Sequence, residues 1–172
     1  MNLPTLFPSS KLSLIAVLAA ATLVSAPAMA QDLGIEVGAQ APSVTVQSLD
    51  GKQVDLARYI GKTPMLIEFW ATWCPNCREL MPTLLDAEKK YGKRVKFVAI
   101  AVAINQSPER VRRWVAANPL PHDTYYDVEG KAASAFDAPA TSYVVVIDKT
   151  GRVVYTGLGG KQDLEAALRK AL

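Results

Sequence analysis

The stretch Ile67–Leu80, IEFWATWCPNCREL, holds the only two cysteines of the chain, Cys74 and Cys77. It begins within a continuous apolar run, Pro64 to Trp70, that one glutamate interrupts. Such a run between turn residues is typical of a buried central strand. Pro75 suits the first turn of a helix, where no amide donor is needed. The sequence therefore predicts that the cysteine pair lies where a buried strand ends and a helix begins.

This position has consequences for the two thiols. The free amides and the dipole at the start of a helix stabilise an anion, and C-x-x-C thiols at such positions have a lowered pKa. Because the thiolate is the nucleophile, we expect Cys74 to be exposed and to attack. Cys77, one turn later, should be more buried and should resolve the mixed disulfide. Trp73 and Pro75, on either side of Cys74, are the expected contacts of a substrate chain.

Glu68 is a second functional candidate. A carboxylate inside an apolar run is unfavourable unless it has a partner or a function. It precedes Cys74 by six residues on the incoming strand, so its side chain can lie behind the helix that starts at the cysteines. There it could exchange a proton with Cys77, directly or through water, as the disulfide opens or forms. The alternative is a glutamate at a polar edge, hydrogen-bonded to a lysine or to the backbone.

Other uses of a C-x-x-C pair fit this chain less well. A structural disulfide across so short a loop constrains the unfolded chain weakly, and a domain of this size can form a core without it. A structural zinc site needs four ligands, whereas the chain has one histidine, His122, which is most simply a loop or surface residue. A thiol peroxidase needs a differently placed cysteine. We therefore expect neither a metal site nor a cofactor.

The composition is that of a single globular domain. The chain has 172 residues, of which 50% are hydrophobic and 20% are charged, and its formal net charge is +3. Because this charge is small and no basic run accompanies it, the composition argues against nucleic-acid binding.

The first thirty residues have the pattern of a secretory signal peptide. Lys11 is the only charge among them, and it precedes an apolar run, Leu12 to Ala26, that is short for a membrane span. Ala28-Met29-Ala30 follows, with small residues at the positions that a signal peptidase recognises. We predict cleavage after Ala30 and a periplasmic or secreted protein; the alternative is an uncleaved anchor. Thiols are usually oxidised outside the cytosol, so a disulfide is the default state of the pair.

The remaining chain divides into a lead-in, residues 31–41, and one domain, residues 42–172. Alternating apolar residues around Asp50-Gly51 predict a β-hairpin. Buried strands are expected over Pro64–Trp70 and Val95–Ile104, and a second hairpin in SYVVVID and RVVYTG. Helices are expected from Pro75 to Gly92 with Pro82 inside, after Ser107-Pro108, weakly in VEGKAASAF, and from Leu164 onward. This order predicts an α/β fold with a mixed sheet and helices on both faces.

Together these motifs resemble the thioredoxin superfamily. The resemblance rests on IEFWATWCPNCREL with Pro82, on DGKQVDL…GKTP before it and on VVVIDKTGRVVYTG after it. The most similar branch is the exported TlpA/ResA-like thiol–disulfide oxidoreductases. It implies a thioredoxin fold with an added N-terminal β-hairpin, a nucleophilic Cys74, a resolving Cys77 and a buried acid at Glu68. Many relatives in this branch reduce disulfides of other exported proteins, including apocytochromes c and copper-delivery proteins, with electrons from a membrane reductase.

The helix after the cysteines departs from the pattern of that branch. The branch often carries a glutamate three residues after the second cysteine, where this chain has Leu80 and places Glu79 one position earlier. A shift of one residue rotates a helical side chain by about 100 degrees. The role is therefore not assigned to Glu79.

The loop that should face the cysteines departs as well. The superfamily has a cis-proline there, whereas counting back from Asp148 places Ser142, preceded by Thr141, at that position. Pro139, three residues earlier, is the alternative occupant. A cis peptide bond between Thr141 and Ser142 would cost about 3 kcal/mol. The bond is therefore either cis at this cost or trans. We expect both residues to contribute to substrate binding, with the Ser142 hydroxyl facing the cysteines.

The resulting hypothesis is an exported, monomeric thioredoxin-fold oxidoreductase that reduces disulfides of other envelope proteins through Cys74 and Cys77. Its expected partners are those substrates and a membrane electron donor such as a thiol–disulfide reductase. Dithiol oxidation or isomerisation remains open. The alternatives from other classes are a metal or copper carrier that uses the thiols as soft ligands and a redox-inert interaction module.

Overall fold

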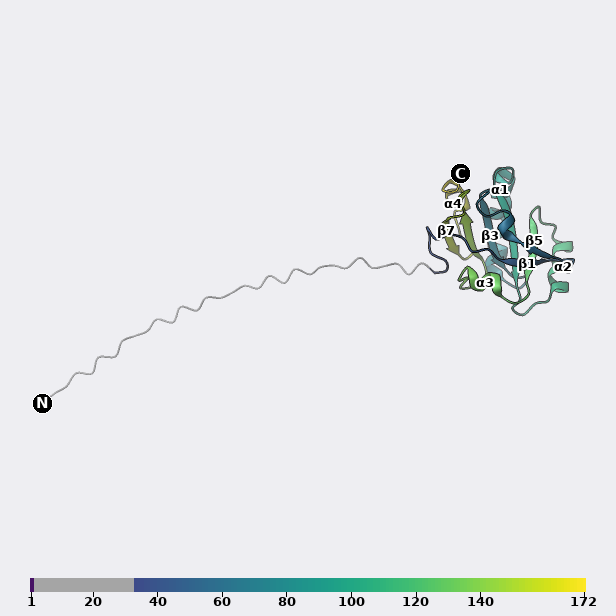
Figure 1. Ribbon diagram of the computed structural model, residues 1–172. Helices are drawn as coiled ribbons and strands as arrows, with labels where there is room; N and C mark the ends of the chain where they lie inside the picture. Colours follow the sequence, from purple (N-terminus) through teal and green to yellow (C-terminus); the bar gives the residue numbers. More distant parts are fainter. Residues whose placement is uncertain (2–32) are drawn as a thin grey trace. The chain divides into compact units, whose positions relative to one another are not determined.

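The structure of this protein is a computed structural model that describes Met1 and residues 33–172 (Figure 1). The expected signal peptide, residues 1–30, lies outside the described residues apart from Met1, and so do the first two residues of the lead-in. Over the described part of the chain, no helix has the length and apolar character needed to cross a membrane.

The described residues form one sheet of seven strands in the order β2-β1-β5-β4-β3-β6-β7 (Figure 1). The strands are β1 Thr45–Ser48, β2 Gln53–Asp55, β3 Met65–Trp70, β4 Lys96–Val102, β5 Asp123–Asp127, β6 Tyr143–Ile147 and β7 Val153–Leu158. Strand β3 runs parallel to β4 and antiparallel to β6. The mixed sheet expected from the element order is therefore confirmed, with the strand that carries Glu68 near its centre.

Local sequence signals determine where the helices begin. The helices are α1 Pro75–Tyr91, α2 Pro108–Ala117, α3 Lys131–Ala135 and α4 Leu164–Arg169, with a 3-10 turn, η1, over Leu56–Arg58. Ser107 caps α2, because its hydroxyl accepts the Arg110 N–H, and Pro108 occupies the first turn. Helix α1 continues through Pro82 to Tyr91, as predicted.

The N-terminal hairpin is joined to the rest of the sheet through β5. Strands β1 and β2 pair antiparallel around the Asp50-Gly51 turn, which confirms the predicted hairpin. Gln47 and Ser48 of β1 also pair with Tyr126 and Tyr125 of β5, and β5 itself runs parallel to β4. Strand β5 thus connects the hairpin to the rest of the sheet.

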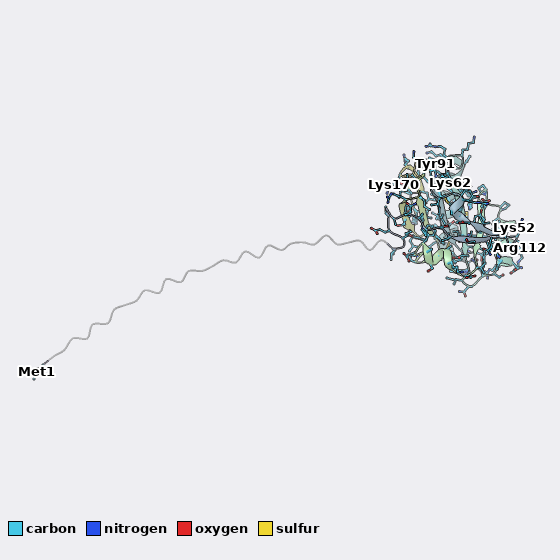
Figure 2. The ribbon with its side chains drawn as sticks, in the orientation of Figure 1. Met1, Lys52, Lys62, Tyr91, Arg112 and Lys170 are labelled. Carbon is cyan, nitrogen blue, oxygen red and sulfur yellow. A yellow bond between two sulfur atoms is a disulfide. The ribbon has the colours of Figure 1, made fainter. Side chains whose placement is uncertain are left out.

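Apolar side chains of β3 alternate between the two faces of the sheet. Leu66 packs in a cluster with Leu80 and Leu84 of α1 and with residues of α4. On the other face, the ring of Phe69 lies 5.7 Å from that of Phe136, just after α3. Both faces are therefore covered, as expected, whereas charged side chains such as Lys62 lie on the outside (Figure 2).

The end of the lead-in is part of the folded domain. Ile35 is buried, and its N–H lies 3.0 Å from the Tyr143 hydroxyl. Further along, Gly38 N–H donates to Val153 O at 2.7 Å, and Ala41 N–H donates to Gly151 O at 2.8 Å. Residues 35–41 therefore run along the start of β7.

Candidate active site

Cys74 and Cys77 form a disulfide at the start of α1, with their Cα atoms 5.3 Å apart. Cys74 is the N-cap of this helix, since its backbone is extended and its Sγ accepts the Cys77 N–H at 3.0 Å. The strand–helix junction that the sequence predicted for the pair is therefore present. A sulfur at this position receives a backbone amide and the positive end of the helix dipole, both of which stabilise a thiolate.

The expected exposure of Cys74 is wrong for the disulfide form. Cys74 and Cys77 are each only 2% exposed. The bond to Cys77 and the amide of Cys77 hold the Cys74 sulfur against the first turn of α1. Both cysteines belong to the hydrophobic cluster that contains Ala71 and Trp70.

Glu68 is a buried carboxyl group, and no charged side chain among the described residues pairs with it. Its side chain shares a face of β3 with Leu66, and that face is covered by α1, the helix of the cysteines. The residue is 1% exposed, and its Oε1 has no hydrogen-bond partner within residues 33–172. Burial raises the pKa of Glu68 to about 8. The carboxyl group is therefore largely protonated at neutral pH.

Trp73 lies at the edge of an apolar groove next to the disulfide. Its side chain is 36% exposed, and its Nε1–H donates to Ile104 O at 2.8 Å. The groove has a volume of about 350 Å³ and is lined by Trp73, Val102, Ile104, Ala133, Ala138, Pro139, Ala140 and Thr141. The structure thus brings Trp73 and Thr141 together. Pro75 is exposed at the start of α1 and does not line the groove.

Ser142 directly precedes β6 and differs from what the sequence predicted. The described residues contain no cis peptide bond, and Ser142 has a left-handed backbone with φ of 62°. It is fully buried; its N–H donates to Phe69 O at 2.8 Å and its hydroxyl donates to Gly159 O at 3.0 Å. The expectation that the hydroxyl faces the cysteines is therefore wrong, because Gly159 accepts its proton. Of the two residues predicted to bind substrate, Thr141 lines the groove, whereas Ser142 is buried behind it.

Comparison with known proteins places this site in a family. A profile of the Redoxin family matches residues 36–172 of the chain. The chain belongs to the Redoxin family. The match covers the hairpin, the cysteine pair and the groove.

Curated relatives and a solved structure resemble this redoxin over most of its length. The Thioredoxin-like protein YneN of Bacillus subtilis is 28% identical over 141 residues, or 80% of this chain and 82% of the relative. The Thiol-disulfide oxidoreductase ResA of Bacillus thuringiensis is 29% identical over 138 residues, 79% of each. A thiol:disulfide interchange protein of the thioredoxin family from Chlorobium tepidum has a TM-score of 0.65 and 25% identity, covering 79% of this chain and 97% of its own. The predicted TlpA/ResA-like membership of the thioredoxin superfamily is confirmed.

The contacts of two polar residues of the redoxin were not predicted from the sequence. Gln106 accepts the Thr72 N–H at 2.9 Å and donates to Val102 O at 2.7 Å, which fixes the loop before the cysteines. His122, expected to be a loop or surface residue, lies in the loop before β5 but is buried there, and its Nδ1 lies 2.6 Å from Glu88 Oε2 of α1. The contact between His122 and Glu88 joins residues 34 positions apart in the sequence, so no local pattern predicts it.

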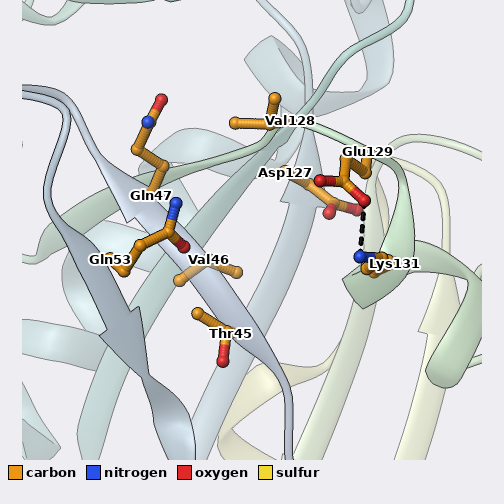
Figure 3. A pocket seen from close by; sticks show the side chains of 8 residues that line it. All are labelled: Thr45, Val46, Gln47, Gln53, Asp127, Val128, Glu129 and Lys131. Atoms are coloured by element: carbon orange, nitrogen blue, oxygen red, sulfur yellow. Dashed lines mark ion pairs between the residues drawn. The ribbon is translucent and has the colours of Figure 1, made fainter.

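No group of three or more histidine, cysteine, aspartate or glutamate side chains converges within residues 33–172 in a way that could hold a metal ion. A separate hollow of about 320 Å³ lies between β1, β2 and the turn after β5 (Figure 3). It is polar, with an ion pair between Glu129 and Lys131, and none of its lining residues belongs to the cysteine site. Asp127 at its rim instead caps α3 by accepting the N–H groups of Ala132 and Ala133.

Proposed function

We propose that this redoxin is an exported thiol–disulfide oxidoreductase that reduces disulfides of other envelope proteins. The observation that carries the proposal is the Cys74–Cys77 disulfide at the N-terminus of α1, on the helix that covers the buried Glu68. Its resemblance to proteins named thiol-disulfide oxidoreductase supports the same chemistry. The groove lined by Trp73, the residue directly before Cys74, would give another chain a place to bind during the exchange.

The reaction begins with the reduced pair. The Cys74 thiolate attacks one sulfur of a substrate disulfide, forms a mixed disulfide and releases one substrate thiolate, which takes up a proton. The Cys77 thiolate then attacks the Cys74 sulfur, releases the second substrate thiolate and forms the Cys74–Cys77 disulfide. Two electrons pass from the pair to the substrate. A dithiol donor, which we propose to be a membrane thiol–disulfide reductase, returns two electrons to the pair.

Glu68 would transfer the proton of Cys77 in this sequence. The pKa of Glu68, about 8, lies close to neutral pH. A proton-transfer group with such a pKa exchanges protons with a thiol efficiently. In molecules whose Glu68 is ionised, the carboxylate accepts the proton that leaves Cys77 as this residue attacks, and the carboxyl group returns it when the pair is reduced again. The apolar environment that raises the pKa of Glu68 also excludes competing proton donors.

The groove would bind the substrate chain beside the disulfide. Trp73 is partly exposed, and its hydrogen bond to Ile104 O fixes the ring, so it offers an apolar platform directly before Cys74. Thr141 and Pro139 also line the groove. Pro75, exposed at the start of α1, would contact the chain on the other side of Cys74.

The export part of the proposal rests on residues 1–30. Lys11, the apolar run after it and Ala28-Met29-Ala30 have the order of a signal peptide cleaved after Ala30. The mature protein would then be a periplasmic or secreted monomer without a cofactor. Its substrates would be exported proteins with disulfides, of the kind reduced during cytochrome c biogenesis.

The test is to trap the mixed disulfide. Cys77→Ser leaves the Cys74 nucleophile but removes the group that resolves the mixed disulfide. Expressed in its native envelope, this variant should accumulate disulfide-linked complexes with exported cysteine-containing proteins, which mass spectrometry identifies. The matched control is Cys74→Ser, which should trap none. A Cys74 that reacts with a small alkylating reagent yet captures no protein would contradict the proposal.

The direction of electron transfer between the cysteine pair and its substrate is tested by a redox titration of the wild-type pair. A reductase should have a potential near that of thioredoxin, about −270 mV, whereas a strong dithiol oxidase lies near about −120 mV. A value close to the latter would replace reduction by oxidation in the proposal. Metal bound by wild type and lost in Cys77→Ser would instead favour the carrier.

A further inference from the structure

Gln162 lies in the loop between β7 and α4, 20 residues along the chain from Ser142. It is 9% exposed and is therefore a buried amide in a loop. Nothing in its sequence context marks it as part of the site around the cysteines. Its contacts, however, all involve the loop that forms one wall of the groove and the strand next to it.

The amide of Gln162 is fully hydrogen-bonded. Its Nε2 group donates to Ser142 O at 3.1 Å and to Gly159 O at 2.7 Å. Its Oε1 accepts the Tyr155 hydroxyl at 3.1 Å. Because two carbonyl oxygens face one end of the amide, only the NH2 group can satisfy that end. The orientation of the Gln162 side chain is thus set by its surroundings.

These bonds hold Ser142 in an unusual backbone conformation. A φ of 62° is rare for a residue other than glycine, asparagine or aspartate. Ser142 O accepts both the Gly159 N–H, at 3.0 Å, and Gln162 Nε2. On its other side, the Ser142 N–H donates to Phe69 O of β3. Ser142 is therefore held from two directions, and the preceding Thr141 is set in the wall of the groove.

The same loop is packed against the helix of the cysteines. A Cβ atom at Gly160 would collide with Glu79, which follows Cys77 by two residues on α1. A Cβ atom at Gly157 would collide with the Tyr155 hydroxyl and with Gln162 Oε1. Glycine is needed at both places because the approach is so close. The loop is thus in contact both with α1, through Gly160 and Glu79, and with Ser142, which directly follows the groove residue Thr141.

We propose that Gln162 is a positioning residue for the exchange reaction: by bonding Ser142 O and Gly159 O, it fixes the Thr141 wall of the groove for a polypeptide substrate. This inference rests on the proposed function, since it concerns how a substrate chain is bound beside Cys74. Gln162 itself contacts neither the cysteines nor the exposed surface of the groove. Its effect should therefore appear in substrate binding and leave the reactivity of the disulfide unchanged.

The experiment compares a polypeptide with a small disulfide. Gln162→Met keeps the length of the side chain but removes its donor and its acceptor. With reduced enzyme and a peptide that contains one disulfide, kcat/KM should fall about tenfold, mostly through KM, which corresponds to about 1.4 kcal/mol of lost binding. The rate with a small aromatic disulfide, which does not need the groove, should equal that of wild type. The matched control is Gln47→Met. In the wild type, Gln47 Nε2 donates to Gly51 O in the N-terminal hairpin, and the loss of this hydrogen bond should change neither rate.

Each other outcome has a defined meaning. Wild type that reduces the small disulfide but not the peptide contradicts the proposed function itself. Active wild type with an unchanged Gln162→Met variant overturns the inference alone, and so does an equal fall with both substrates, which indicates a purely structural role. If Gln162→Met does not fold, Gln162→Glu, which keeps the acceptor for Tyr155, and the milder Tyr155→Phe are measured for the same difference between substrates. The inference is overturned if neither variant shows this difference between the two substrates.

Discussion

Glu68 is the residue whose ionisation links stability to the redox reaction. In the unfolded chain its pKa is near the ordinary 4.5, whereas burial raises it to about 8 in the folded protein. Between these two values the folded state binds the proton and the unfolded state does not. The stabilisation from the neutral carboxyl is therefore fully present below about pH 4.5 and is lost as the pH rises through about 8.

This difference predicts how Glu68→Gln changes the pH profile of stability. The amide has nearly the same shape and carries no charge, so the variant should be more stable than wild type at pH 9 and nearly equal to it at pH 4. Between these limits the free energy of unfolding of the wild type should fall more steeply, by up to about 1.4 kcal/mol per pH unit. Urea unfolding of the oxidised proteins across this range measures it. Parallel profiles would contradict the raised pKa of Glu68.

Sequence patterns located the site residues but not their surroundings. Cys74, Cys77 and Glu68 were found because a strand, a helix start and an isolated charge are local features. The burial of Cys74 and the direction of the Ser142 hydroxyl depend on the disulfide and on Gly159, which local patterns do not report. For the same reason the amide of Gln162 could not be assigned to the groove from the sequence.

At the scale of elements, prediction succeeded where a local signal exists. Ser107-Pro108 and Pro75 mark the starts of α2 and α1, and continuous apolar runs mark β3 and β4. The pairing of β1 with β5 was not predicted, because it joins residues nearly eighty positions apart through backbone hydrogen bonds that carry no side-chain signature. The short helix α3, expected weakly within VEGKAASAF, is present at Lys131–Ala135, but its cap was not predicted because it comes from a residue outside the helix.

Asp127 caps α3, so its removal should lower the free energy of unfolding. Helix α3 has no side-chain cap at its own N-cap residue, Gly130, whereas the buried Asp127 accepts the N–H groups of Ala132 and Ala133. Asp127→Ala leaves two donors unpaired and should lower the free energy of unfolding by about 2–3 kcal/mol. Urea unfolding and hydrogen exchange at Ala132 and Ala133 measure the effect. Asp127→Asn, which keeps one acceptor, should lose about half as much; unchanged exchange in Asp127→Ala would argue against the cap.

For the whole domain, the residues before the first strand complete the fold. Residues 35–41 were expected to be only a lead-in, because they are polar and contain glycine. In the structure they run along β7, and Ile35 closes the cluster that contains Phe136 and Tyr143. The sheet face that carries Phe69 would otherwise be open at this place. We therefore propose that the domain begins near residue 35, within the expected lead-in.

A shortened chain tests this boundary. A protein that begins at Pro42 should unfold at a lower urea concentration than one that begins at Gln31, with a loss of about 3 kcal/mol, because Ile35 is no longer buried and the Tyr143 hydroxyl loses its partner. Within the longer chain, Ile35→Ala should account for about 2 kcal/mol of this loss. Val37→Ala, at a position that is 45% exposed in the same segment, should change stability by less than about 0.5 kcal/mol. Equal unfolding midpoints for the two chains would show that residues 31–41 contribute nothing to the fold, and the boundary would return to residue 42.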